Sequence, residues 1–157
     1  MISRIVKVVL LSNPLSKEGR ALLLSIISGI FLILHGLVHL LYFGQSARRF
    51  ELQPGMVWPD GSWVFAGPFG NEATRILASV ACVLAAIGFV AGGIAIFATQ
   101  AWWRPVILGS AAFSVVIFIL LWDGQPHALA NKGLLGILIN LAILVALLVF
   151  RWPRLGF

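Results

Sequence analysis

Two histidines lie four residues apart in the first long apolar segment of the chain. This segment, residues 21–43, reads ALLLSIISGIFLILHGLVHLLYF and contains His35 and His39. Residues four apart share one face of a helix, with their Cβ atoms about 6 Å apart, so the two imidazoles would point the same way. Because ionisable groups are costly in hydrocarbon, the pair predicts either a functional site or a polar contact between helices.

The residues around the pair narrow its chemistry. Gly-Leu-Val separates the two histidines, so the glutamate of the zinc-peptidase motif is absent and we predict no metal site. Asp123 and His127 follow the third apolar segment and could reach the same side of the membrane. The open alternatives are hydrogen bonding between helices, or a site for a quinone, a haem or a lipid headgroup. Haem ligated by two histidines is disfavoured, because both membrane histidines share one helix.

A polar stripe extends from the pair along the first segment. Alternating steps of three and four residues connect a series in which five of six members are polar or amphipathic: Ser25, Ser28, Leu32, His35, His39 and Tyr42. We expect this stripe to face the interior of a helix bundle. Ser110 and Ser114 in the third apolar segment, and Asn140 in the fourth, could add polar groups there. The predicted ligand-binding site opens outward and is formed by His35, His39, Asp123, His127 and Asn140.

Four apolar segments indicate the fold that must position these groups. The 157 residues are 61% hydrophobic and 10% charged, and the mean hydropathy is +1.04. Segments of 18 or more apolar residues are typical of membrane-spanning helices, and they occur at about 21–43, 76–98, 105–122 and 133–150. We therefore predict an all-α integral membrane four-helix bundle, with residues 1–157 forming a single membrane domain.

The charges predict an orientation. Seven basic residues lie on the side of the N-terminus and four on the other side, where four acidic residues offset them. This is the positive-inside pattern, so both termini are predicted to be cytoplasmic and the location to be a bacterial inner membrane. Residues 1–20 would be a basic segment on the cytoplasmic leaflet. The net charge of +6 is thereby explained without a nucleic-acid partner.

The only long connection, residues 45–72, is predicted to lie outside. It contains MVWPDGSWVF, in which two short β-prone runs flank Pro59-Asp60-Gly61. Such a turn signal between apolar runs favours a small β-hairpin. Trp58 and Trp63 would then flank the turn at the level of the outer lipid headgroups.

Small residues form one face of the second apolar segment. They include Ala81, Ala85, Gly88 and Gly92, and the last two form a Gly-x-x-x-Gly pair. Small residues let helix backbones approach closely in a membrane. The face is therefore predicted to pack a helix, either within the chain or against another membrane protein or a second copy.

The first segment also carries a resemblance. Leu34-His35-Gly36-Leu37-Val38-His39-Leu40 resembles the start of small, uncharacterised four-span bacterial membrane proteins with a His-Gly-x-x-His first helix. More distantly, the chain is similar to DoxX-like proteins, which have a Gly-x-x-basic element that Gly36-x-x-His39 would occupy. That resemblance implies four spans and a quinone-linked redox role.

The residues favour a small inner-membrane protein that is a non-enzymatic accessory or structural subunit with a polar intramembrane site. One alternative is a redox-associated protein that binds a quinone or haem. The other is a small transporter or lipid-binding module. No Ser-His-Asp set, phosphate-binding loop or cysteine pair in the sequence points to an enzyme.

Overall fold

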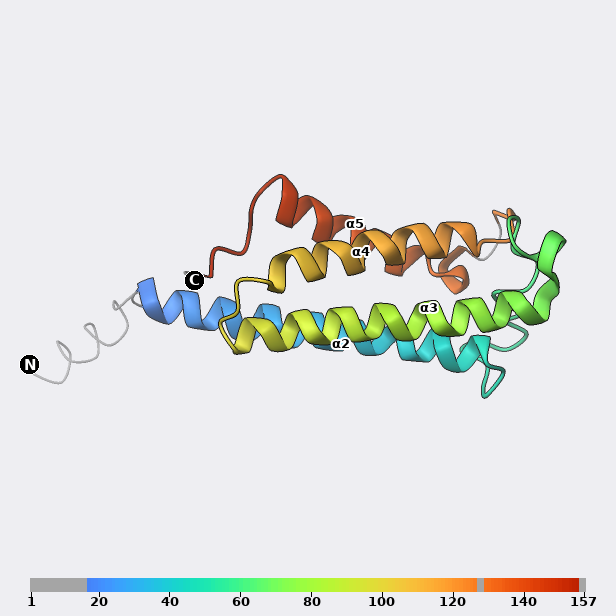
Figure 1. Ribbon diagram of the computed structural model, residues 1–157, viewed down its shortest axis with the longest axis horizontal. Coiled ribbons are helices and arrows are strands. Elements are labelled where there is room, and N and C mark those ends of the chain that lie inside the picture. Colours follow the sequence, from blue (N-terminus) through green and yellow to red (C-terminus); the bar gives the residue numbers. More distant parts are fainter. Residues whose placement is uncertain (1–16, 127–128, 156–157) are drawn as a thin grey trace, which may run out of the picture.

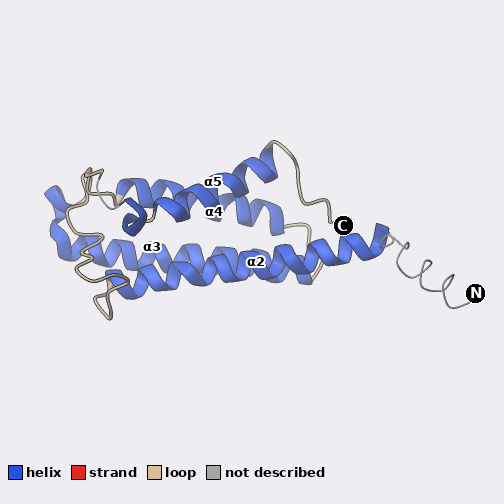
Figure 2. Cartoon of the chain, turned by 180° about the vertical axis from the view of Figure 1, so that it is seen from behind, coloured by secondary structure: helices blue, strands red, loops and turns tan. Residues whose placement is uncertain are grey.

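The computed structural model describes residues 17–126 and 129–155, and within them it contains helices and no strand (Figure 2). The elements are α2 (Lys17–Ser46), α3 (Ala66–Phe97), α4 (Trp103–Leu120), the short 3-10 helix η1 (Leu129–Lys132) and α5 (Leu134–Leu148). The all-α class is confirmed. Most of the predicted basic segment 1–20, and His127, lie outside the described residues.

Three of the helices, α2, α3 and α4, are long and apolar enough to cross a membrane. The fourth, α5, is apolar but has only 15 residues, which corresponds to a length of about 22 Å at 1.5 Å per residue. A typical hydrocarbon core is about 30 Å thick. The three long apolar helices are therefore those expected of a membrane-embedded protein, whereas the fourth crossing stays a prediction.

Consecutive helices lie side by side in the order of the sequence (Figure 1). The pair α2 and α3 forms the most extensive contact, α4 packs on α3, and α5 packs on α4. α2 begins and α5 ends at the same end of the molecule, called here the terminal end. The connection between α2 and α3 lies at the opposite end, called the loop end.

Glycines bring α3 close to both of its neighbours. A Cβ atom added at Gly36 of α2 would lie 2.9 Å from Cβ of Phe89 in α3. On another face of α3, a Cβ at Gly88 would collide with the Ser110 hydroxyl of α4, and one at Gly92 with Ile107. The Gly-x-x-x-Gly pair therefore lies against α4 of the same chain.

The predicted hairpin at the loop end is wrong. Residues 47–65 form turns and bends. Their backbone groups hydrogen-bond to side chains and to helix ends rather than to a partner strand. Gln45 donates to the carbonyl oxygen of Met56 at 2.8 Å and accepts from Leu52 N–H at 2.9 Å. Ser62 and Trp63 donate from their side chains to the last carbonyls of α4. A helix end has unpaired carbonyls, whereas an isolated two-stranded ribbon is marginal in stability.

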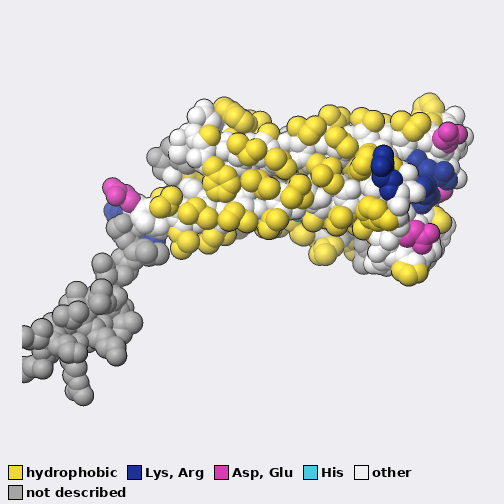
Figure 3. Space-filling view, turned by 90° about the horizontal axis from the view of Figure 1, so that it is seen from below, with side chains coloured by type: hydrophobic (Ala, Val, Ile, Leu, Met, Phe, Trp, Pro, Cys, Tyr) yellow, Lys and Arg dark blue, Asp and Glu magenta, His cyan; other side chains and the backbone are white. Residues whose placement is uncertain are grey.

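The outer surface of the bundle is apolar. Hydrophobic side chains cover the face seen in Figure 3, and charged side chains gather at the two ends. The pattern along α2 is consistent: Leu34, Leu37 and Val38 are exposed, while Leu32, His35 and His39 are buried. The predicted inward-facing stripe is therefore confirmed over its central part. Such a surface suits lipid as the surrounding solvent.

Candidate functional site

His35 and His39 lie at the centre of the bundle. Their exposed fractions are 6% and 4%, and the rings meet edge to face with centroids 5.2 Å apart. Ser114 of α4 and Asn140 of α5, at 0% and 1%, are equally buried beside them. The site thus combines side chains from three helices, and each comes from a position that the sequence marks as polar within an apolar run.

Hydrogen bonds link the four side chains into one cluster, called here the histidine cluster. Nε2 of His35 lies 2.7 Å from Oδ1 of Asn140. Nδ2 of Asn140 donates to Oγ of Ser114 at 2.8 Å, and the same oxygen lies 2.8 Å from Nε2 of His39. Nδ1 of His39 lies 3.1 Å from the backbone oxygen of His35. The chain of contacts therefore returns to the residue where it started.

The acceptors in this ring fix the positions of the protons. Oδ1 of Asn140 and the carbonyl of His35 can only accept, so Nε2 of His35 and Nδ1 of His39 must each carry hydrogen. A neutral His39 then accepts at Nε2, and the Ser114 hydroxyl donates to it. Every bond runs in the same direction with both imidazoles neutral. Such one-way chains are cooperative, and full pairing makes a buried polar network tolerable.

Aromatic rings close the histidine cluster on two sides. Phe89 of α3 lies against both imidazoles, with ring centroids 4.8 Å from His35 and 5.4 Å from His39. Towards the loop end, Phe118 lies 6.0 Å from His39, and Trp58 stacks on Phe118 at 5.2 Å. The predicted opening towards the outside is therefore not seen, because the connection places an indole over that end.

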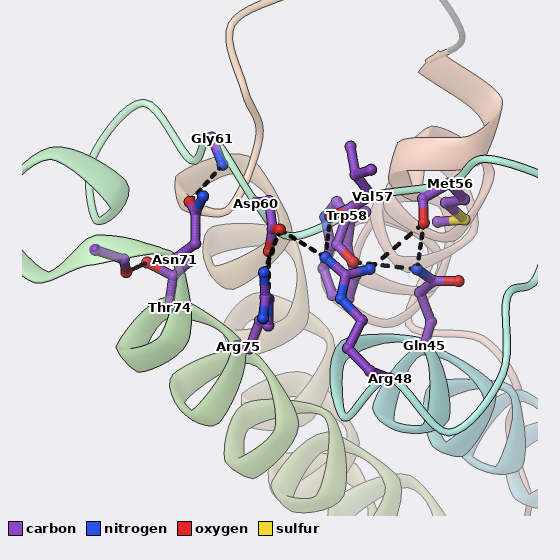
Figure 4. A network of polar contacts seen from close by, with 11 residues as sticks. Gln45, Arg48, Met56, Val57, Trp58, Asp60, Gly61, Asn71, Thr74 and Arg75 are labelled. Atoms are coloured by element: carbon purple, nitrogen blue, oxygen red, sulfur yellow. Dashed lines mark hydrogen bonds and ion pairs between the residues drawn. The ribbon is translucent and has the colours of Figure 1, made fainter.

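Trp58 was expected at the headgroup level, and that expectation is wrong. Its exposed fraction is 4%, whereas that of Trp63 is 60%. Trp58 packs between Tyr42 and Phe118 because Gln45 and Arg48 hold the carbonyls around it (Figure 4). Sequence reasoning missed this closure, since an aromatic residue in a loop carries no signal that it will insert into a bundle.

Asp123 does not join the histidines. Its carboxylate contacts Nζ of Lys132 at 2.7 Å and accepts from the backbone of Gln125. Burial alone would raise the pKa of Asp123, but the hydrogen bonds from Lys132 and from the backbone of Gln125, together with the charge of Lys132, leave the pKa below its usual value. Within residues 17–126 and 129–155, no three His, Cys, Asp or Glu side chains are grouped to hold a metal ion. Of the predicted site residues, the structure brings together His35, His39 and Asn140, with Ser114 beside them, and separates Asp123 from them. His127 lies outside the described residues.

The geometry does not suit a haem or a quinone. Three of the four imidazole nitrogens already bond to protein atoms, so an iron or a quinone oxygen would have to break the ring of hydrogen bonds. Both imidazoles also project from α2 and bond to helices on one side. Two ligands on opposite faces of a macrocycle need facing helices.

The loop end carries a second polar network (Figure 4). The carboxylate of Asp60 accepts two hydrogen bonds from Arg75, at 2.7 and 2.6 Å, and also forms an ion pair with Arg48 at 2.7 Å. Burial would raise the pKa of Asp60, but Arg75 and Arg48 together hold it below its usual value. Asn71 accepts from Gly61 N–H, which ties the connection to the start of α3. This network positions the segment that covers the histidine cluster.

Comparison with protein-family models, with curated proteins and with solved structures finds no match of significance in any of the three. The resemblance to DoxX-like proteins therefore stays a prediction.

Proposed function

We propose that this chain is a non-enzymatic integral membrane protein, an accessory or structural subunit, in which the histidine cluster locks the helices together. The closed ring of hydrogen bonds carries the proposal, because it connects α2, α4 and α5 through buried side chains that hydrogen-bond to one another. Few contacts join α2 to α5 elsewhere, so the bond between His35 and Asn140 is a principal tie between them.

The orientation belongs to the same proposal. We place the terminal end in the cytoplasm of a bacterial cell, with four crossings of the inner membrane. Supporting this, five of the nine basic residues in the described part of the chain lie at the terminal end with one acidic residue, whereas four lie at the loop end with four acidic residues. Basic residues accumulate on the cytoplasmic side. The η1 turn before α5 and the segment after it would extend the short fourth helix towards the two surfaces.

A partner, if the chain has one, would meet a face other than the small-residue face of α3. Gly88 and Gly92 lie against α4. The side of α3 that faces neither α2 nor α4 is exposed and aliphatic, with Ile76, Val80 and Leu84 all more than half exposed. That side offers van der Waals contact to lipid or to another membrane helix.

A double-mutant cycle tests the lock. His35→Leu, Asn140→Leu and the double variant are compared with the parent by unfolding in a mild detergent. Single variants leave a buried polar group unpaired, so each should lose about 1–3 kcal/mol, with a coupling of about 1 kcal/mol between them. Leu141→Ala, at an exposed position of α5, is the control and should change little. A coupling of zero would reject the lock.

The redox alternative is tested on the same sample. A visible absorption spectrum and extraction of quinone from gently purified protein should show neither chromophore nor quinone at stoichiometric amounts. A stoichiometric cofactor that is lost in the His35→Leu variant would replace the structural proposal with the redox one.

A further inference from the structure

Three arginines converge at the terminal end without acidic partners. Arg104 is the second residue of α4, and Arg151 and Arg154 follow α5. Together with neighbouring residues they line a cavity of about 350 Å³. The three ion pairs found among the described residues all lie at the loop end of the molecule and involve none of these arginines. Three like charges beside one cavity are unfavourable unless an anion joins them.

Arg104 gives the strongest indication. Its Nε and Nη2 atoms are buried and have no hydrogen-bond partner among the described residues. Its guanidinium carbon lies 5.7 Å from the centre of the Trp103 ring, so the group is held by stacking rather than by a carboxylate. A buried charged donor without a partner is costly, and each such group calls for an explanation. An anion in the adjoining cavity would supply the missing acceptor.

The C-terminal segment is folded so that it presents the other two arginines. Pro153 and Leu155 are buried, while Arg151 and Arg154 are exposed. Arg151 has a φ of 49°, a left-handed conformation that is uncommon for residues other than glycine and that persists where the surroundings impose it. After α5 the red segment turns back across the terminal end (Figure 1), and its Arg151 and Arg154 line one cavity with Arg104 at the beginning of α4.

An apolar groove adjoins the arginine cavity. This second cavity, of about 260 Å³, is bounded by α2, α4, α5 and the C-terminal segment. Trp103 and Pro153 line both cavities, so the two share a wall. Ile27, Phe31 and Trp152 along the groove are about half exposed, which leaves it accessible from the lipid side. A ligand that fits both must have an anionic group joined to a hydrocarbon chain.

The position along the bundle identifies the source of such a ligand. Trp102 and Trp152, both about half exposed, lie at the terminal end, and tryptophans of this kind mark the level of lipid headgroups. We propose that the terminal end binds an anionic phospholipid from the adjacent leaflet. Its phosphate accepts hydrogen bonds from Arg104, Arg151 and Arg154, and one acyl chain occupies the groove between α2 and α5. Basic pockets between helices recognise anionic lipid headgroups in this way.

The test is lipid-dependent stability of the full chain in an uncharged detergent. Phosphatidylglycerol should raise the unfolding temperature of the parent protein with a saturable dependence, and phosphatidylcholine with the same chains should not. Arg104→Gln should weaken the apparent affinity more than about tenfold, since it removes hydrogen bonds to a charged group. The Arg151→Gln/Arg154→Gln double variant should weaken it by about fivefold or more for each charge lost.

Arg49→Gln is the matched control, because it removes the same charge from the loop end, where Arg49 lies over Phe43. Its affinity should stay within about twofold of the parent, since surface charges more than a Debye length away are screened. Without lipid, Arg104→Gln should change the unfolding temperature little, because loss of the stacking on Trp103 is offset by removal of the unpaired buried donors. Equal weakening by Arg49→Gln, or a saturable stabilisation of Arg104→Gln by phosphatidylglycerol equal to that of the parent, would overturn the proposal.

Two further arms separate the lipid from a free phosphate. Ala146→Trp should fill the apolar groove and weaken phosphatidylglycerol binding. Glycerol 3-phosphate, which lacks the acyl chains, should give no saturable stabilisation at the concentrations that saturate with the lipid. If glycerol 3-phosphate binds as tightly as the lipid, the site takes a soluble phosphate and the lipid assignment is wrong.

Discussion

Arginines at the two ends of this molecule differ in whether a carboxylate pairs with them. At the loop end, Arg48 and Arg75 share Asp60, and the connection that they hold covers the histidine cluster. At the terminal end, Arg104, Arg151 and Arg154 have no carboxylate among the described residues. A buried polar network whose partners are all supplied by the chain stabilises the fold, whereas a buried charged group without a partner calls for an explanation. On this difference rest the two proposals, that the histidines are structural and that the arginines bind an anionic lipid.

The largest expected effect comes from removing Trp58, which covers the histidine cluster at the loop end. Trp58→Ala deletes a buried indole that stacks on Phe118, and such truncations cost about 3–5 kcal/mol. Unfolding in detergent measures it. Trp63→Ala is the matched control, because Trp63 is 60% exposed and donates one hydrogen bond. It should cost about 1 kcal/mol. Equal losses would show that the loop does not seal the cluster.

A smaller effect distinguishes a side-chain hydrogen bond between two helices from one within a single helix. Ser114→Ala removes the hydroxyl that joins His39 to Asn140 and should cost about 1–2 kcal/mol, since two buried groups lose a partner. Ser110, one turn earlier, donates to the carbonyl of Val106 in its own helix. Ser110→Ala should therefore cost less than about 0.5 kcal/mol, because such a bond contributes little to a helix. The comparison would fail if both serines proved equally important.

Acid should weaken the loop end selectively. The pKa of Asp60 is lower in the folded protein than its ordinary value, because Arg75 and Arg48 outweigh the effect of burial. The stabilisation is therefore complete above the ordinary pKa of about 4 and is lost as the pH falls through the lower folded value. Unfolding followed from pH 6 to pH 3 should show this decline. Asp60→Asn should have a lower free energy of unfolding at pH 6, and that free energy should change less with pH. If the variant loses stability in parallel with the parent between pH 6 and pH 3, Asp60 is not the source of the decline.

The sequence allowed much of the fold to be predicted, for reasons that are physical. Long apolar runs have few alternatives to a helix, and the spacing of His35 and His39 placed them on the inner face of α2. The partners could not be predicted to the same degree. Asn140 and Ser114 stood out as polar residues in apolar runs, but only the packing of α4 and α5 shows that they close a ring. Asp123 was expected on the same side of the membrane as the histidines, yet its carboxylate pairs with Lys132 instead.

Turn chemistry misled the prediction at the loop end. Pro59-Asp60-Gly61 does form a turn, but Gln45 and Arg48 take the carbonyls that strand pairing would have used. The basic residues on the side of the N-terminus indicate an orientation from the sequence, but no local pattern shows that residues 104 and 151–154 meet at one cavity.

Histidine nitrogen NMR shows directly whether the histidine cluster is a closed ring of hydrogen bonds. The protein is labelled with ¹⁵N histidine in detergent, and the His127→Gln variant is used to remove the third histidine signal. A closed ring requires two neutral imidazoles of opposite tautomer, with hydrogen on Nε2 of His35 and on Nδ1 of His39. Two rings of the same tautomer, or rings that average between tautomers in exchange with water, would contradict it.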